Sequence, residues 1–286
     1  MKRLLFLIAL CLLAIPVLGQ TGKERDASGN GIQSEFYLEI IKGDVRNHSR
    51  IDKFGAANDI GTAWTIVSLS KTYQTPTTAT AIEILSSDAD DTAAGAGLQE
   101  LCVSGLGSGW QDLTECKGLN GTSAVVLDSS FTRIFRVYGN RSGAYATTAG
   151  SSQQGTITVR TSPGGATWAI LAVESSFGFG QSLIGAYTVP RGYTAYVGAY
   201  HVDSESTKAP TIAFFKRCNA DDVTTPYAGV MQLQSLHRDV VGAIDIAHQI
   251  PLGPYEGPCD IGFFAKAASS TADVSVQFEI ILVKTD

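Results

Sequence analysis

From residue 36 onward, short apolar runs alternate with clusters of turn-forming residues. Most of the runs are rich in β-branched residues, which favour a half-buried, pleated strand. We predict strands at residues 36–42, 78–85, 99–105, 123–128, 133–139, 155–161, 167–173, 182–189, 193–202, 211–218, 241–250, 259–266 and 272–283. Turn clusters at residues 119–121, 162–165 and 190–192 contain Gly, Pro or Asn. Short strands with this punctuation are typical of a β-sandwich or a jelly roll.

Helical signal is scarce, because no stretch of a dozen residues places apolar side chains at i, i+3, i+4 and i+7. The Gly-, Ala- and Ser-rich residues 141–155 indicate a long loop, and a second break follows shortly after it. At about 150 residues per domain, 286 residues suggest one large or two smaller domains. We predict an all-β protein with two β-sandwich or jelly-roll-like domains in tandem, at residues 50–162 and 163–286. Residues 20–49 are predicted to form a flexible leader and the first strand.

The first residues have the layout of a secretory signal peptide. Lys2 and Arg3 precede the apolar run 4–18, and Val17 and Gly19 place a β-branched and a small residue at positions −3 and −1 before Gln20. The run is shorter than the roughly 20 residues that span a bilayer, so an uncleaved anchor is the weaker alternative. No other segment is long enough to span a membrane. We therefore predict cleavage of residues 1–19 and a location outside the cytoplasm, either extracellular or on the surface of a cell or particle.

Cleavage would leave four cysteines, Cys102, Cys116, Cys218 and Cys259. An even number of cysteines in an exported chain fits two disulfides, for which three pairings are possible. We favour Cys102–Cys116 and Cys218–Cys259, because the two members of each pair fall on segments that read as neighbouring strands. A zinc site is the weaker alternative, since the sequence has no Cys-x-x-Cys and its four histidines lack ligand spacing.

Composition restricts the function further. The chain has 27 Asp and Glu against 21 Lys and Arg, a net charge of −6, and 44% of its residues are hydrophobic. This apolar content can bury a sizeable core, which excludes global disorder. The acidic balance argues against nucleic-acid binding by counterion release and against a polybasic membrane surface.

The acidic loop around Asp88, Asp90 and Asp91 is a weak candidate for a Ca²⁺ site. It departs from the EF-hand loop at Thr92 and Ala93, and Asp also populates turns because it hydrogen-bonds its own backbone. We therefore predict a solvated turn and no metal site. Replacing the three aspartates together by Asn is expected to change the melting temperature little.

Catalytic motifs are weak in this chain. His237-Arg238-Asp239 resembles a kinase catalytic loop, but the Gly-rich phosphate loop and the Asp-Phe-Gly motif are missing, so a turn between two strands is expected. A Ser-His-Asp triad assembled from distant strands is an alternative that sequence alone leaves open. We predict no catalytic residues, no cofactor and no enzymatic activity.

Exposed aromatic side chains could form a glycan-binding platform. The candidates for glycan contact are Trp64, Trp110 and Tyr193, with Trp168, Tyr196 and Tyr200 as further members. Aromatic residues on strands more often belong to the core or to cross-strand pairs.

Residues 36–62, FYLEIIKGDVRNHSRIDKFGAANDIGT, resemble the opening of a family of uncharacterised structural-type proteins of marine tailed bacteriophages. That family typically begins with FYLEV-x-x-G-x-x-x-x-H-S and continues with KFGRNPDID. Lys53, Phe54, Gly55, Asp59 and Ile60 match, whereas the three residues between Gly55 and Asp59 depart from Arg-Asn-Pro. The resemblance continues through residues 86–97, 119–122, 184–197 and 274–282, and so covers residues 36–286.

This resemblance implies a non-catalytic structural protein of virion type, such as a decoration, fibre or spike-like subunit. Its expected partners are copies of itself in a homo-oligomer, or other surface and virion proteins. The family usually begins near FYLE, so the added signal peptide favours an exported relative. The alternatives are a secreted module that binds a cell surface or a glycan, and a hydrolase with a dispersed site.

Overall fold

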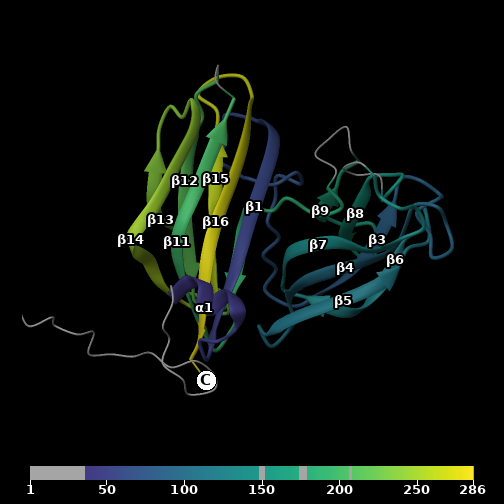
Figure 1. Cartoon of the computed structure of the whole chain (residues 1–286), viewed down its shortest axis with the longest axis horizontal. Helices are drawn as coiled ribbons and strands as arrows, with labels where there is room; N and C mark the ends of the chain where they lie inside the picture. The colour runs from purple at the N-terminus through teal and green to yellow at the C-terminus, as the bar shows by residue number, and fades with distance from the viewer. Residues whose placement is uncertain (1–35, 148–151, 174–178, 206–207, 286) are drawn as a thin grey trace, which may run out of the picture. The chain divides into compact units, whose positions relative to one another are not determined.

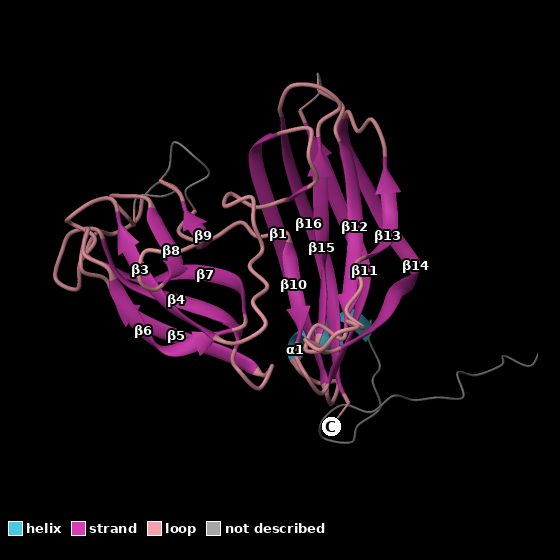
Figure 2. Cartoon of the chain, turned by 180° about the vertical axis from the view of Figure 1, so that it is seen from behind, coloured by secondary structure: helices cyan, strands magenta, loops and turns pink. Residues whose placement is uncertain are grey.

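The computed structural model describes residues 36–147, 152–173, 179–205 and 208–285, and nearly every regular element among them is a strand (Figures 1 and 2). The predicted signal peptide and residues 20–35 of the leader lie outside the described residues. Contacts divide the chain into two compact units after Ser49. The prediction of an all-β protein is confirmed.

The predicted first strand is wrong, because residues 36–42 form the helix α1 (Phe36–Lys42). The Lys42 ammonium lies 3.0 Å from the Glu39 carboxylate, an i, i+3 pair that a helix places on one face. Gly43 has φ 81° and ends the helix, and its N–H donates to the Ile40 carbonyl at 3.0 Å. Glycine adopts this left-handed conformation without steric cost, which makes it a common helix terminator.

A four-stranded and a five-stranded antiparallel sheet form the larger sandwich. The first sheet has the order β1 (His48–Ile60), β16 (Ala272–Lys284), β11 (Tyr193–Ser204), β14 (Gly242–Glu256). The second has the order β10 (Ala186–Val189), β15 (Cys259–Lys266), β12 (Thr211–Cys218), β13 (Gln232–His237), and the short β2 (Thr65–Ile66) also pairs with β15. Counting the eight main strands along the chain gives the sheets 1-8-3-6 and 2-7-4-5. That order, with two interlocked Greek keys, is a jelly roll.

Aromatic side chains dominate the jelly-roll core. Phe214, Phe263 and Phe278 are fully buried, and the ring centroids of Phe214 and Phe263 lie 4.9 Å apart. Tyr187 and Tyr255 are buried in the same cluster. Tilted and edge-to-face contacts of this kind stabilise a core beyond the area that they bury.

A smaller sandwich is inserted between β2 and β10. One of its sheets has the order β6 (Val125–Phe131), β3 (Thr80–Ser86), β8 (Ile157–Thr161), β9 (Thr167–Leu171). The other has the order β5 (Asp112–Gly118), β4 (Leu98–Leu106), β7 (Arg133–Ser142). Its core is mainly aliphatic, with Ile82, Ile84, Leu101 and Val103 at 0% exposure, and it also contains Phe131 and Trp168.

The predicted boundary near residue 163 falls inside this smaller sandwich. Residues 162–165 form the turn between β8 and β9, which are hydrogen-bonded to each other. Gly164 has φ 63° and the Gly165 N–H donates to the Thr161 carbonyl at 2.7 Å, as a tight turn requires. A Ser-Pro-Gly-Gly cluster marks a reversal of the chain, whether or not a domain ends there.

Candidate functional site

Among the predicted metal-site residues, Asp91 is fully buried rather than part of a solvated turn. Its carboxylate accepts hydrogen bonds from the Ser86 hydroxyl at 2.5 Å and from the Leu98 N–H at 2.7 Å. It also accepts the N–H groups of Gln154 at 2.9 Å and Gly155 at 2.8 Å. These four donors occupy the lone pairs of the carboxylate, so Asp91 joins three segments of the smaller sandwich.

Asp88 and Asp90 lie in the exposed turn that precedes Asp91. The Asp88 carboxylate accepts the Asp90 N–H at 2.9 Å, the local hydrogen bond expected of an Asp turn. In the described ranges, no group of three His, Cys, Asp or Glu side chains could hold a metal ion. This hydrogen bond therefore stabilises the turn that leads into Asp91.

The predicted glycan-contact aromatics differ sharply in exposure. Trp64 is 45% exposed, with the Lys266 ammonium 5.0 Å from its ring centroid. Trp110 is only 6% exposed, so its ring is not part of an exposed aromatic platform. It lies in the turn between β4 and β5 and its ring faces the Arg133 guanidinium at 4.8 Å. Tyr193, at the start of β11, is half-buried.

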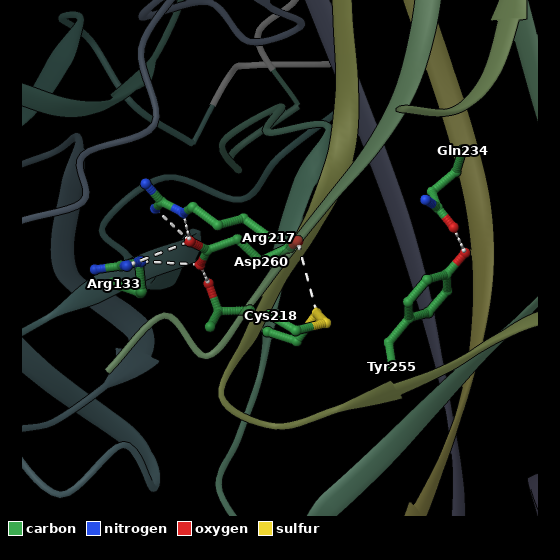
Figure 3. The surroundings of a disulfide bond; sticks show 8 residues. Arg133, Arg217, Cys218, Gln234, Tyr255 and Asp260 are labelled. Atoms are coloured by element: carbon green, nitrogen blue, oxygen red, sulfur yellow. Dashed lines mark hydrogen bonds and ion pairs between the residues drawn. A yellow bond between two sulfur atoms is a disulfide. The ribbon is translucent and has the colours of Figure 1, made fainter. Parts of the chain in front are cut away.

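The four cysteines form the two predicted pairs. Cys102 on β4 lies opposite Cys116 on β5, and their Cα atoms are 4.0 Å apart. Cys218 ends β12 opposite Cys259, which begins β15 (Figure 3). Each disulfide therefore links two neighbouring antiparallel strands.

Next to the second disulfide, Asp260 is the centre of a buried ion cluster (Figure 3). The Arg133 Nε donates to Oδ1 at 2.9 Å and the Arg217 Nε donates to Oδ2 at 2.9 Å. The Thr188 hydroxyl donates to Oδ1 as well. Burial alone would raise the pKa of Asp260, but the charges of Arg133 and Arg217 hold that pKa below its ordinary value.

The two arginines of this cluster are placed differently. The Arg133 side chain is 2% exposed, and its Nη1 donates to the Thr132 carbonyl at 2.7 Å and to the Pro76 carbonyl at 3.3 Å. The Arg217 side chain is 23% exposed. A cavity of about 230 Å³ lies beside the cluster, lined by residues 75–77, both arginines and the loop after Cys218.

A second hollow of about 310 Å³ lies on the outer face of the sheet that contains β11, β14 and β16. Ala199 on β11 faces Ala247 on β14, and these small side chains leave room between the larger neighbours. His201 Nδ1 lies 2.6 Å from the Asp245 carboxylate, with Gln277 on the other side of His201 in the sheet register. The hollow thus offers hydrogen-bond donors and acceptors around a small apolar floor.

Neither His201 nor His237 is hydrogen-bonded to both a serine hydroxyl and a carboxylate among the described residues, as a hydrolase triad requires. His201 pairs with Asp245, but no serine hydroxyl hydrogen-bonds to it in the described part of the chain. His237 Nε2 lies 2.9 Å from the Tyr200 hydroxyl and 3.4 Å from the Ser235 hydroxyl, and burial lowers the pKa of His237. Within the described residues, His237 makes no hydrogen bond to a carboxylate.

The jelly roll has two edge strands beside each other, β13 and β14, joined by the turn at residues 238–241. We call residues 230–250 the open edge. Its exposed large apolar side chains are Val230 (58%), Met231 (47%), Leu233 (58%), Leu236 (40%), Val241 (58%) and Ile250 (85%). Unpaired strand edges that carry apolar side chains are sites of association with another chain.

A β-bulge gathers two of these side chains on one face. Leu233 lies opposite Phe215 and Leu236 lies opposite Ala213, with a register shift between them. Residues opposite each other in a sheet point to the same face, and alternate residues of one strand do too. Both leucines therefore share the face of Phe215, opposite the one from which Phe214 enters the jelly-roll core.

The architecture defines the class of this protein: an all-β chain with a jelly roll and an inserted antiparallel sandwich. No protein-family model matches the sequence, and no curated protein matches it. The described part of the chain contains no helix with the length and apolar character that crossing a bilayer requires.

Similar solved structures include two from infectious bursal disease virus. The Gx strain structure is 10% identical with a TM-score of 0.22, and the alignment covers 82% of this chain and 76% of that one. The T13 viral particle is 9% identical with a TM-score of 0.20, covering 83% and 74%. Isomalto-dextranase of Arthrobacter globiformis T6 is 15% identical with a TM-score of 0.21, covering 78% of this chain and 36% of that chain. Likeness at these TM-scores carries no argument about function.

Proposed function

We propose that this chain is a non-catalytic structural protein of virion type whose jelly rolls assemble with further copies through the open edge. The observation that carries the proposal is the pair of neighbouring edge strands with exposed apolar side chains between residues 230 and 250. Jelly rolls are a frequent architecture of viral capsid domains. The resemblance of residues 36–286 to virion-associated phage proteins supports the same assignment.

The open edge suits a second copy of the same chain. Backbone N–H and C=O groups on an edge strand can pair with the same strand of another copy, and an antiparallel pair is related by a two-fold axis. Charged residues commonly block edge-to-edge pairing in monomeric proteins. Between Val230 and Ile250 the charged residues are Arg238 and Asp239, which lie in the turn, and Asp245 on β14, so the two strands themselves carry one charge there. Apolar contacts of Leu233 and Leu236 would add to the backbone hydrogen bonds.

Sedimentation velocity across a concentration series tests the proposal. Leu233→Glu places a charge on the open edge, whereas the control Val126→Glu makes a similar change at a residue of the smaller sandwich that is 48% exposed. We expect an oligomer for the unmodified protein and for the control, and a monomer for Leu233→Glu. A monomeric unmodified protein, or equal behaviour of the two variants, would contradict the proposal.

The export proposal has a separate test. Two disulfides suit an oxidising compartment, as expected of a chain that is exported with cleavage before Gln20. Mass spectrometry of native material should find Gln20 at the N-terminus and identify the assembly that contains the chain. Native protein that begins at Met1 and carries free thiols would contradict export.

A secreted glycan-binding module is the second candidate, and the hollow around His201 favours it. The hollow combines polar side chains with a small apolar floor, which suits a sugar ring, and jelly rolls also occur in lectins. A glycan array with the unmodified protein and with Ala247→Trp, which would fill the hollow, tests this candidate. The glycan-binding function is supported if the unmodified protein binds a defined glycan and Ala247→Trp does not.

A further inference from the structure

The ion cluster around Asp260 contains one more positive charge than negative charge. Asp260 supplies one carboxylate, whereas Arg133 and Arg217 each supply a guanidinium. The Tyr73 hydroxyl lies 2.6 Å from the Thr188 hydroxyl and extends the hydrogen-bond chain without adding charge, since burial raises the pKa of Tyr73. Arg133 is buried whereas Arg217 is 23% exposed, so the unmatched positive charge lies on the solvent-facing side of the cluster, where an anion can approach it.

Arg217 is the group that can receive this counter-charge. Its Nε and Nη2 both donate to the Asp260 carboxylate, while its Nη1 makes no hydrogen bond to any described residue. Because Nη1 has no such partner and is not a buried atom, it is open to solvent. The Arg217 side chain lines the cavity of about 230 Å³ beside the cluster.

The other walls of the cavity carry hydroxyl and amide groups that can either donate or accept hydrogen bonds. Thr75 and Thr77 contribute hydroxyl groups and Asn219 contributes an amide. Asp222 is the acidic residue in the lining, and its carboxylate accepts the Thr224 N–H at 3.2 Å and the Ala228 N–H at 2.8 Å. Both Asp222 oxygens therefore accept hydrogen bonds from the backbone of the loop, and the Asp222 charge remains part of the cavity lining.

We propose that this cavity binds an oxyanion, such as a carboxylate or sulfate group, through the free Nη1 of Arg217. A guanidinium presents N–H donors in a plane that matches such groups. The cavity is smaller than typical pockets for drug-sized ligands, so it accommodates the acidic group and leaves the rest of a larger ligand outside. The acidic substituent of a sugar and a free inorganic anion share this chemistry.

Isothermal titration calorimetry at fixed ionic strength, with chloride as the background anion, tests the site. The probes are sulfate, phosphate and glucuronate, with glucose as the neutral partner of glucuronate. We expect saturable binding of at least one anion and none of glucose. Tighter binding of glucuronate than of sulfate and phosphate would indicate an acidic sugar, and the reverse a free anion.

Asn219→Asp is the matched variant, because it adds a negative charge to the cavity wall without changing the shape of the side chain. Residue 219 has φ 55°, which both Asn and Asp tolerate. We expect anion affinity to fall on the order of tenfold. The control is Asn120→Asp in an exposed turn of the smaller sandwich, which makes the same substitution outside the cavity and should leave affinity unchanged.

Three results would overturn the proposal. These are no saturable binding of any anion to the unmodified protein, equal affinity in Asn219→Asp, or an equal loss of affinity in Asn120→Asp. The last result would mean that only the overall charge of the protein matters. Arg217 itself is left unchanged in this test because it also partners Asp260 and its replacement alters the cluster.

Discussion

At the scale of single residues, buried charges determine much of the local structure. Asp91 and Asp260 are both carboxylates with almost no exposure, yet they are satisfied in different ways. Asp91 accepts bonds from hydroxyl and backbone groups, whereas Asp260 pairs with two guanidinium groups. A buried carboxylate with such partners is stabilising as a unit and costly to disrupt in part.

Asp91→Asn should destabilise the protein by about 3 kcal/mol. The amide keeps one acceptor oxygen but turns an NH₂ group toward donors that are N–H or O–H groups. Urea unfolding measures the free-energy change. Asp90→Asn, in the same loop, is the control and should change stability by no more than about 0.5 kcal/mol. Equal stability of the two variants would show that the Asp91 contacts contribute little.

The pH dependence of stability should report the pKa of Asp260. Because that pKa is lowered in the folded protein, its contribution is complete above the unfolded value near 4 and is lost as the pH falls through the folded value. Arg217→Met removes one of the two charges that lower the pKa, so acid unfolding should begin at a higher pH. Arg191→Met, at an exposed ion pair with Asp221, is the control. The free energy of unfolding is measured by urea titration at several pH values. The same decrease with falling pH in all three proteins would refute this prediction.

At the scale of elements, strands with β-branched runs were predictable and irregular ones were not. The strands β3, β11, β12, β15 and β16 lie within a few residues of their predicted bounds. By contrast, β1 and β13 escaped prediction, because HSRIDKFGAANDI and QLQSLH carry polar residues on both faces or at an edge. The helix α1 escaped because its seven residues are too short for helical periodicity to show.

The ion cluster could not be predicted for a different reason. Arg133 and Asp260 lie 127 residues apart, so only the fold brings their charges together. The available signal was local: both residues stand beside apolar strand residues, in RIFRVYG and CDIGFFAK. A charge in an apolar run indicates a buried partner, but it does not identify that partner.

The two disulfides should contribute unequally to stability. The sequence separation is 14 residues for Cys102–Cys116 and 41 for Cys218–Cys259, and loop entropy grows with separation. Replacing both members of a pair by Ala should cost about 3 kcal/mol for the first and about 4 kcal/mol for the second. Urea unfolding of both variants provides the comparison, with the reduced unmodified protein as a reference. A larger loss for the first pair would show that chain entropy does not set the order.

At the scale of the whole molecule, residues 50–286 form one compact unit although they contain two sandwiches. Phe215 of the jelly-roll strand β12 belongs to the same buried cluster as Ile82 and Ile84 of the smaller sandwich. Its ring lies 4.6 Å from that of Phe264. A shared cluster of this kind couples the unfolding of the parts that it joins.

Calorimetry should therefore record a single unfolding transition for residues 50–286. Phe215→Ala, which leaves a cavity in the shared cluster, should destabilise by about 3–5 kcal/mol and divide the transition into two. Val126→Ala, at an exposed residue of the smaller sandwich, should do neither. Two separate transitions in the unmodified protein would show that the sandwiches unfold independently.

The pairing of β1 with β16 also constrains how the chain reaches this structure. The first strand of the jelly roll hydrogen-bonds to the last, so its sheet cannot close until residues 272–284 have left the ribosome or a translocation channel. The strands of the smaller sandwich lie within residues 80–171, so this sandwich can form while β1 is still unpaired. Contacts between such distant segments slow folding. During that delay β1 and β11 are themselves unpaired edges, so the nascent chain is more prone to aggregation than the finished molecule.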